Sequence, residues 1–158
     1  MRLTLAATLA ALLAMSGAQA QQALAPGYGP AITLDAARKV VEAGISNAQQ
    51  RNLQMAVAVV DPAGNLVAFA RVDGTQTASL NVALDKAKSA AAYRRSTKVF
   101  EDALVGGRMA ILALPGAMPV EGGLLLTAEN HIIGAVGVSG GTAAEDGQVA
   151  AAAIASGR

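Results

Sequence analysis

The sequence predicts an α/β protein of the α+β kind, with an antiparallel sheet of four to five strands and helices packed on it. Two pairs of short β-branched segments, each joined by a short turn, predict β-hairpins. Ala-rich stretches with apolar residues at helical spacing lie before, between and after these hairpins. Strands joined by short turns pair antiparallel, and the intervening helices then cover the sheet.

The first half of the pattern is a helix followed by a hairpin. Thr33 can cap a helix over residues 34–51, whose apolar positions recur at helical spacing. Residues 55–60 are predicted as a strand, and residues 66–72 as its partner. The turn between them, 61–65, has Pro early and Gly late, as β-turns prefer.

The middle of the chain is predicted to be helical. Residues 77–93 form an Ala-rich helix, and residues 97–104 a second, shorter one that ends at a Gly pair. Residues 108–114 are apolar and are interpreted as a short strand.

The last part repeats the hairpin and closes with a helix. Residues 120–127 and 132–139 are predicted strands joined by the turn 128–130, and residues 142–155 form the final helix.

The chain is predicted to consist of a leader, a short lead-in and one domain. Arg2, an uncharged apolar run over residues 3–15 and the small residues of an A-x-A site at 18–20 make residues 1–20 a secretory signal peptide. Residues 21–32 are rich in Pro and Gly and form an irregular lead-in, and residues 33–158 form the domain. We therefore expect a periplasmic or secreted protein with no membrane span in its mature chain.

Charge and cysteine content exclude several function classes. Cleavage removes Arg2 from the twelve basic residues and leaves eleven, against eleven acidic ones. The mature chain then has no net charge to attract nucleic acid. The chain has no cysteine, so it has neither disulfides nor a thiolate metal site.

Residues 132–146 read as a strand, a glycine turn and a helix start. Gly134 and Gly137 have no side chain, so another backbone or a flat ligand can approach the strand closely at these two positions. Thr142 and Glu145 have the spacing of a capping box, and the adjacent Asp146 is explained by the helix dipole. The turn 139–141 points N–H groups at the helix entrance and is interpreted as a place for an anion.

This block resembles the GlcG/HbpS family of small haem-binding and haem-degrading proteins (DUF336-type). The matching segments are V-V-D-P-A-G-N-L at 59–66, R-V-D-G at 71–74 and P-G-A-M-P-V at 115–120, in the family's order. Ser79, Lys86 and neighbouring alanines match as well, so the resemblance covers nearly all of residues 33–155. It implies a profilin-like fold, a homo-oligomer, a small-molecule ligand and haem as the cofactor.

A polar cluster is predicted around Lys86, which sits in an apolar stripe at the family's K-A position. A lysine there needs an anionic partner, either Asp73 or a ligand carboxylate. Lys86→Met is accordingly expected to weaken ligand binding and to leave folding intact. The predicted ligand-binding residues are Arg71, Asp73, Ser79, Lys86, Ser139 and Gly140.

Two residues are candidate haem ligands. The family's histidine ligand, where used, comes from the N-terminal helix or the segment before it, and residues 21–54 contain no His. The only His, His131, sits at a turn and is interpreted as solvated. Tyr93, beside Arg94 and Arg95, is the preferred alternative, with the arginines on the haem propionates. Haem binding is therefore expected to be weak or high-spin.

No catalytic motif stands out, and three functions remain open. The preferred one is an exported protein that binds haem or another anionic flat molecule. The second is an enzyme, of lyase, isomerase or haem-degrading type, acting on a small carboxylate in the same pocket. The third is an oligomeric accessory protein without a small ligand.

Overall fold

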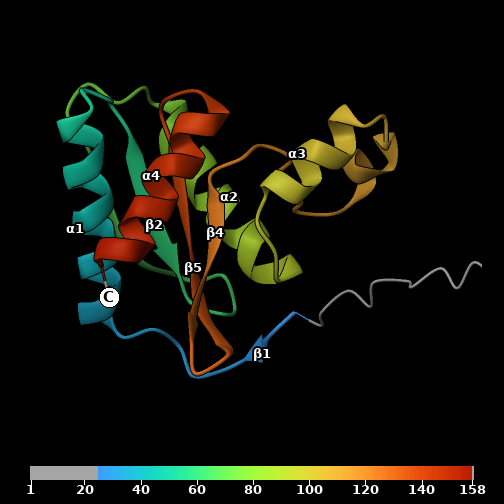
Figure 1. Ribbon diagram of the computed structural model, residues 1–158, viewed down its shortest axis with the longest axis horizontal. Coiled ribbons are helices and arrows are strands. Elements are labelled where there is room, and N and C mark those ends of the chain that lie inside the picture. The colour runs from blue at the N-terminus through green and yellow to red at the C-terminus, as the bar shows by residue number, and fades with distance from the viewer. Residues whose placement is uncertain (1–24, 158) are drawn as a thin grey trace, which may run out of the picture.

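The computed structural model describes residues 25–157, so the predicted signal peptide and the first residues of the lead-in lie outside it. The order of elements begins with a short strand and ends with a helix (Figure 1). The elements are β1 (Gly27–Tyr28), α1 (Leu34–Gln50), β2 (Ala56–Val60), β3 (Leu66–Arg71), α2 (Ala78–Tyr93), α3 (Lys98–Val105), the 3-10 helix η1 (Met109–Ala113), β4 (Gly123–Ala128), β5 (His131–Ser139) and α4 (Ala143–Ser156).

The five-stranded sheet is organised around β5. Strands β2 and β4 pair with β5 antiparallel, and β3 extends the sheet beyond β2. Strand β1 pairs parallel with the first two residues of β5. Strand β5 can pair along two edges, and β4 pairs along one of them. Strand β1 therefore pairs along the same edge as β2, beyond the end of β2. The fold thus confirms the predicted sheet of antiparallel hairpins with packed helices.

Helices cover both faces of the sheet. Figure 1 shows α1 and α4 together on one face and α2 on the other. The alternation of side chains along β2 and β5 explains this arrangement. Val57, Val59, Val136 and Val138 belong to the larger core with α1 and α4. Except for Val60, the residues that face α2 are smaller, namely Ala56, Ala58, Ala135 and Gly137.

Helix α2 packs almost directly on the backbone of the sheet. A Cβ at Gly137 would overlap the carbonyl oxygen of Ala83 and would lie 2.6 Å from the amide nitrogen of Ala87. A Cβ at Gly123 would likewise overlap the carbonyl of Lys86. At Gly137 and Gly123 a helix backbone therefore approaches the strands, which at Gly137 is the first of the two alternatives, another backbone or a flat ligand, that the sequence leaves open.

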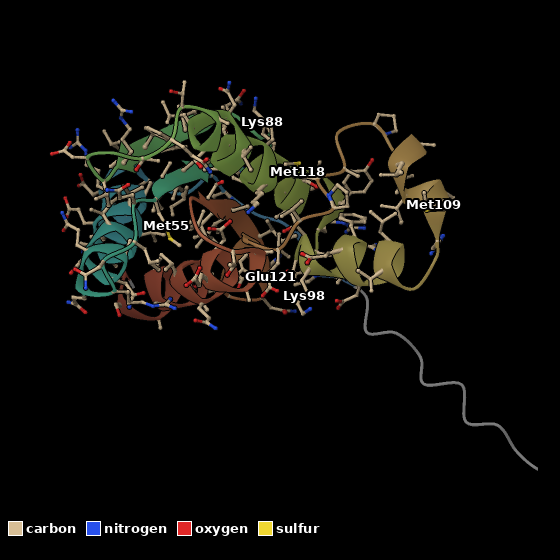
Figure 2. All side chains as sticks on the ribbon, turned by 90° about the horizontal axis from the view of Figure 1, so that it is seen from above. Met55, Lys88, Lys98, Met109, Met118 and Glu121 are labelled. Carbon is tan, nitrogen blue, oxygen red and sulfur yellow. The ribbon has the colours of Figure 1, made fainter. Side chains whose placement is uncertain are left out.

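Residues 98–119 form an arm that projects from the body of the molecule. Helix α3 and the segment around η1 extend away from the sheet in Figure 1, and Met109 lies at the far end in Figure 2. The predicted strand over residues 108–114 is wrong, because this segment lies away from the sheet and folds into η1. Met109 and Leu112 are 63% and 60% exposed, while Ile111 is buried.

The lead-in differs from the irregular segment that its Pro and Gly content predicts. Gly27–Tyr28 pairs with β5, and the Tyr28 hydroxyl donates a hydrogen bond to the carbonyl of Ala91 at 2.9 Å. Gly29 then passes so close to His131 that a Cβ would lie 2.7 Å from the histidine Cβ.

Within residues 25–157, no helix is both long and apolar enough to cross a bilayer.

Candidate functional site

Lys86 is a buried cation whose partner is Asp146. The two side chains are 1% and 3% exposed, and Lys86 Nζ lies 2.6 Å from Asp146 Oδ2. The Lys86 ammonium also donates to the carbonyl of Val138 at 3.1 Å. The expectation that Asp73 or a ligand carboxylate neutralises Lys86 is therefore corrected. The ion pair joins α2, β5 and α4 at one end of the sheet.

Burial dominates the electrostatics of Asp146. Loss of hydration raises the pKa of this carboxyl, and hydrogen bonds from Lys86 and from the Gly141 amide at 3.0 Å oppose the rise. Both side chains of the pair are buried, and the carboxylate accepts from Lys86 and from the Gly141 amide. We infer that the pair supports the fold.

Sequence reasoning misses Asp146 because the helix dipole already explains an acidic residue at this position. A usable signal was present in the spacing of α4. Asp146 stands on the same helical face as Val149, Ala150 and Ala153, which are all buried. An acid on a buried stripe requires a cation, and Lys86 is the fully buried cation of the described chain.

Ser79 and Ser139 meet beside this pair. The Ser139 hydroxyl donates to the Ser79 hydroxyl at 3.3 Å, and both residues are buried. Gln76 Nε2 donates to Ser79 at 3.0 Å. At Gly140, with φ of +150°, a Cβ would lie 2.7 Å from Met55 Cα, so no side chain fits. The two hydroxyls and the turn form a closed, internally bonded region.

The amides expected to bind an anion are already used within the chain. The Gly141 amide donates to Asp146, and the Thr142 amide donates to Glu145 Oε2 at 2.8 Å. These bonds to Thr142 hold the pKa of Glu145 below its usual value. The capping box is present, as its spacing predicts. The chain's own carboxylates therefore take the place of the anion expected at this turn.

Arg71 and Asp73 lie on the surface, apart from Lys86. Arg71 is opposite Ala56 on β2, which is opposite Ser139 on β5. Arg71 thus belongs to the same row as Ser139 but lies two strands away, roughly 10 Å across the sheet. Within residues 25–157, neither Arg71 nor Asp73 is in an ion pair. The predicted set therefore separates into a buried part and an exposed part.

Tyr93 is held by the chain through its hydroxyl. That hydroxyl donates to the carbonyl of Pro115 at 2.6 Å, and the ring packs edge-on against Phe100 with centroids 5.1 Å apart. The Arg95 guanidinium lies over the Phe100 ring, 5.9 Å from its centroid. Tyr93 thus anchors the arm, and ligation of iron would require the bond to Pro115 to break.

Within residues 25–157, the imidazole of His131 makes one hydrogen bond, through Nδ1. Its Nδ1 lies 2.8 Å from the carbonyl oxygen of Glu129. A carbonyl oxygen only accepts, so Nδ1 carries the proton and Nε2 of the neutral ring keeps its lone pair. The side chain is exposed, as the turn position predicts. A carbonyl bond to one nitrogen is the usual way to orient a histidine whose other nitrogen binds a metal.

An apolar hollow of about 220 Å³ lies beside the β4–β5 hairpin, between the start of α1 and the end of α4. Ala128, the register partner of His131, is part of its wall. Cross-strand partners project from the same face of a sheet, so the His131 side chain leaves the sheet on the same face as that of Ala128. The residues that line the apolar hollow are Ile32, Ala36, Val40, Leu126, Thr127, Ala128, Ile133, Ile154 and Gly157.

A second hollow, here called the α1–β3 groove, has a volume of about 360 Å³. Its wall on one side is α1, and on the other side the outer edge of β3. The lining residues are Leu34, Arg38, Val41 and Glu42 of α1 and Val67, Ala68, Phe69 and Ala70 of β3. Within residues 25–157, no three His, Asp or Glu side chains gather into a metal site.

The fold and these features define a small α/β protein with surface hollows and a buried ion pair, Lys86–Asp146. The chain belongs to the family described as haem degrading protein HbpS-like, whose model matches residues 32–155. It is 40% identical to Protein GlcG of Escherichia coli over 103 residues, which are 65% of this chain and 77% of GlcG. It is 35% identical to an uncharacterised 15.0 kDa Citrobacter freundii protein over 127 residues, 78% of this chain and 89% of that protein.

Solved structures show the same fold. The chain superposes on Klebsiella pneumoniae ORFY with a TM-score of 0.76 and 30% identity, over 82% of this chain and 92% of that one. For a double mutant of Streptomyces reticuli HbpS the TM-score is 0.74 and the identity 29%, over 96% and 97% of the two chains. For PduOC in complex with haem, the TM-score is 0.73 and the identity 25%, over 80% and 94%.

Proposed function

We propose that this protein is an exported binder of haem or of a related flat anionic molecule. The family and the haem complex of PduOC support this class of ligand. The observation that carries the proposal is the apolar hollow, one of whose wall residues, Ala128, is the register partner of His131. An apolar wall suits the edge of a macrocycle, and a neutral imidazole nitrogen suits its iron.

The size of the apolar hollow determines how much of a haem it can cover. Its volume of about 220 Å³ is below the roughly 300–1,000 Å³ of most small-molecule pockets. It therefore covers one edge of a macrocycle and leaves the rest against solvent or a second subunit. His131 is the only histidine of the chain, so a subunit by itself offers one imidazole. Both facts favour weak, high-spin haem binding.

The geometry favours His131 over Tyr93 as the haem ligand, in contrast to the preference drawn from the sequence. Within residues 25–157, Nε2 of His131 has no hydrogen-bond partner, while the Tyr93 hydroxyl is bonded to Pro115. His131→Ala is expected to weaken haemin binding by more than the roughly 10–100-fold that loss of an outer-shell partner costs. Tyr93→Phe is the matched control and is expected to leave affinity and spectrum unchanged.

The measurement is a haemin titration followed at the Soret band. The protein is expected to saturate at one haem per subunit with a high-spin spectrum. A spectrum that collapses in Tyr93→Phe and persists in His131→Ala would move the site to the arm. No saturable Soret band in the unsubstituted protein would refute haem as the ligand.

Export is proposed on the sequence of residues 1–20. The mature protein is expected to begin at Gln21 and to be found in the periplasm or outside the cell. Mass spectrometry of the fractionated protein tests this prediction. An intact segment 1–20 on protein from the periplasm or medium would contradict it.

We also propose that the protein assembles with copies of itself. Exposed apolar side chains support this, among them Leu66 at 52%, Val105 at 83% and Leu112 at 60% exposure. Assembly would also cover the part of a haem that the apolar hollow leaves open.

A further inference from the structure

Strand β3 ends the sheet with half of its backbone groups directed outward. In an antiparallel pair, alternate residues bond to the partner and the others point away from it. The Val72 amide donates to the Met55 carbonyl at 2.9 Å, and the register continues from there along β2 and β3. Ala70 and Ala68 therefore bond to β2. Phe69 and Arg71 direct their N–H and C=O groups away from β2, at the edge of the sheet.

Within residues 25–157, the edge carries little that would prevent pairing with another strand. Proteins protect exposed edges with Lys, Pro, bulges or a covering element. The sequence of β3 is L-V-A-F-A-R, in which Arg71 is the only charge. The register shift of this hairpin lies at its turn end, between Val59 and Val60, and leaves Ala68 to Arg71 regular. Phe69 is 37% exposed beside this edge.

Helix α1 adds charges of both signs to the same edge. Arg38 and Glu42 line the α1–β3 groove and, one turn apart, lie on one face of α1. Within residues 25–157, neither side chain is in an ion pair. A two-fold axis that passes between two antiparallel copies of α1 at the level of Val40 places Arg38 of each copy opposite Glu42 of the other. The surface is thus complementary in charge to itself.

We propose that β3 pairs antiparallel with β3 of a second copy about a two-fold axis, with Phe69 of each copy opposite Arg71 of the other. The outward groups of these two residues then bond reciprocally, and the two sheets become continuous. The axis is perpendicular to the sheet, so both α1 helices lie on the same face. Because α1 of each copy packs on β3 and β2, the two helices face each other across the axis. This inference rests on the proposed self-assembly and is independent of the ligand.

A charge-reversal series measured by sedimentation tests the pairing. By symmetry, Arg38→Glu replaces two attractive contacts by two repulsive ones, and the dissociation constant is expected to rise about tenfold. The double substitution Arg38→Glu with Glu42→Arg restores opposite charges across the axis and is expected to restore the affinity. Lys39→Glu makes the same charge change at the next, exposed position and is the matched control, expected to have no effect.

A backbone variant tests the strand pairing itself. Phe69→Pro removes an amide that points outward, while the bonds of Ala68 and Ala70 to β2 remain. It is expected to reduce the oligomer to a smaller species with unchanged far-ultraviolet circular dichroism. If this variant does not fold, the charge series decides. An oligomer that no variant affects would overturn the β3 interface and leave self-assembly standing. A protein that is monomeric at high micromolar concentration would overturn both.

Discussion

Lys86→Met is expected to lower the free energy of unfolding by about 3–5 kcal/mol, the cost of leaving one member of a buried ion pair alone. Asp146 is 2% exposed and would keep a carboxylate without its cation. The methionine fills the space of the lysine stem, so lost packing contributes little. Urea unfolding of the variant measures the effect.

The double variant Lys86→Met with Asp146→Leu is the control for this prediction. It removes both charges, and replacing a buried ion pair by apolar side chains is often neutral for stability. We expect it to regain most of the lost free energy. If Lys86→Met alone has the same free energy of unfolding as the parent protein, the ion pair does not support the fold. That result would favour the sequence-based expectation that Lys86 faces a ligand.

Gly137→Ala is expected to destabilise the protein by about 3 kcal/mol, the upper end of the usual cost of overpacking. The new methyl group would overlap the carbonyl of Ala83, which belongs to the backbone of α2 and has no rotamer to adopt. Helix α2 must move away from the sheet, and its contacts with β2 and β5 loosen. Thermal and urea unfolding report the loss.

Gly27→Ala is the matched control for the Gly137 variant. A Cβ at Gly27 has no neighbour within 4 Å, so the change is expected to stay within about 0.5 kcal/mol. Equal stability of Gly137→Ala and Gly27→Ala would contradict the close approach of α2 to β5.

The elements of the fold follow from local patterns in the sequence. The apolar segments 55–60 and 66–72, with a turn between them that has Pro early and Gly late, predict the β2–β3 hairpin. The helix starts at Thr33 and Thr142 follow from capping, and both side chains accept the bond that capping requires. The short strand predicted at 108–114 is wrong, because an apolar run by itself does not distinguish a strand from a turn of 3-10 helix.

Which residues meet at the site depends on long-range contacts, and no local sequence pattern encodes these. Lys86 and Asp146 are 60 positions apart, and their pairing arises because α2 and α4 pack at the same end of the sheet. The sequence does indicate that Lys86 is buried and needs an anion. It does not indicate which anion, and the match to a family motif drew attention to Asp73. The apolar hollow was missed because its walls come from both ends of the domain.

The central claim is that the ligand binds at the apolar hollow and not at the Lys86 end of the sheet. The most direct test is a ¹⁵N–¹H correlation spectrum of the protein titrated with gallium protoporphyrin IX, a diamagnetic analogue of haemin. We expect the saturable amide shifts to gather at Ile32, Ala128, His131 and Ile133. Shifts that gather instead at Ser79, Ser139 and Gly140, with those four amides unmoved, would contradict the account.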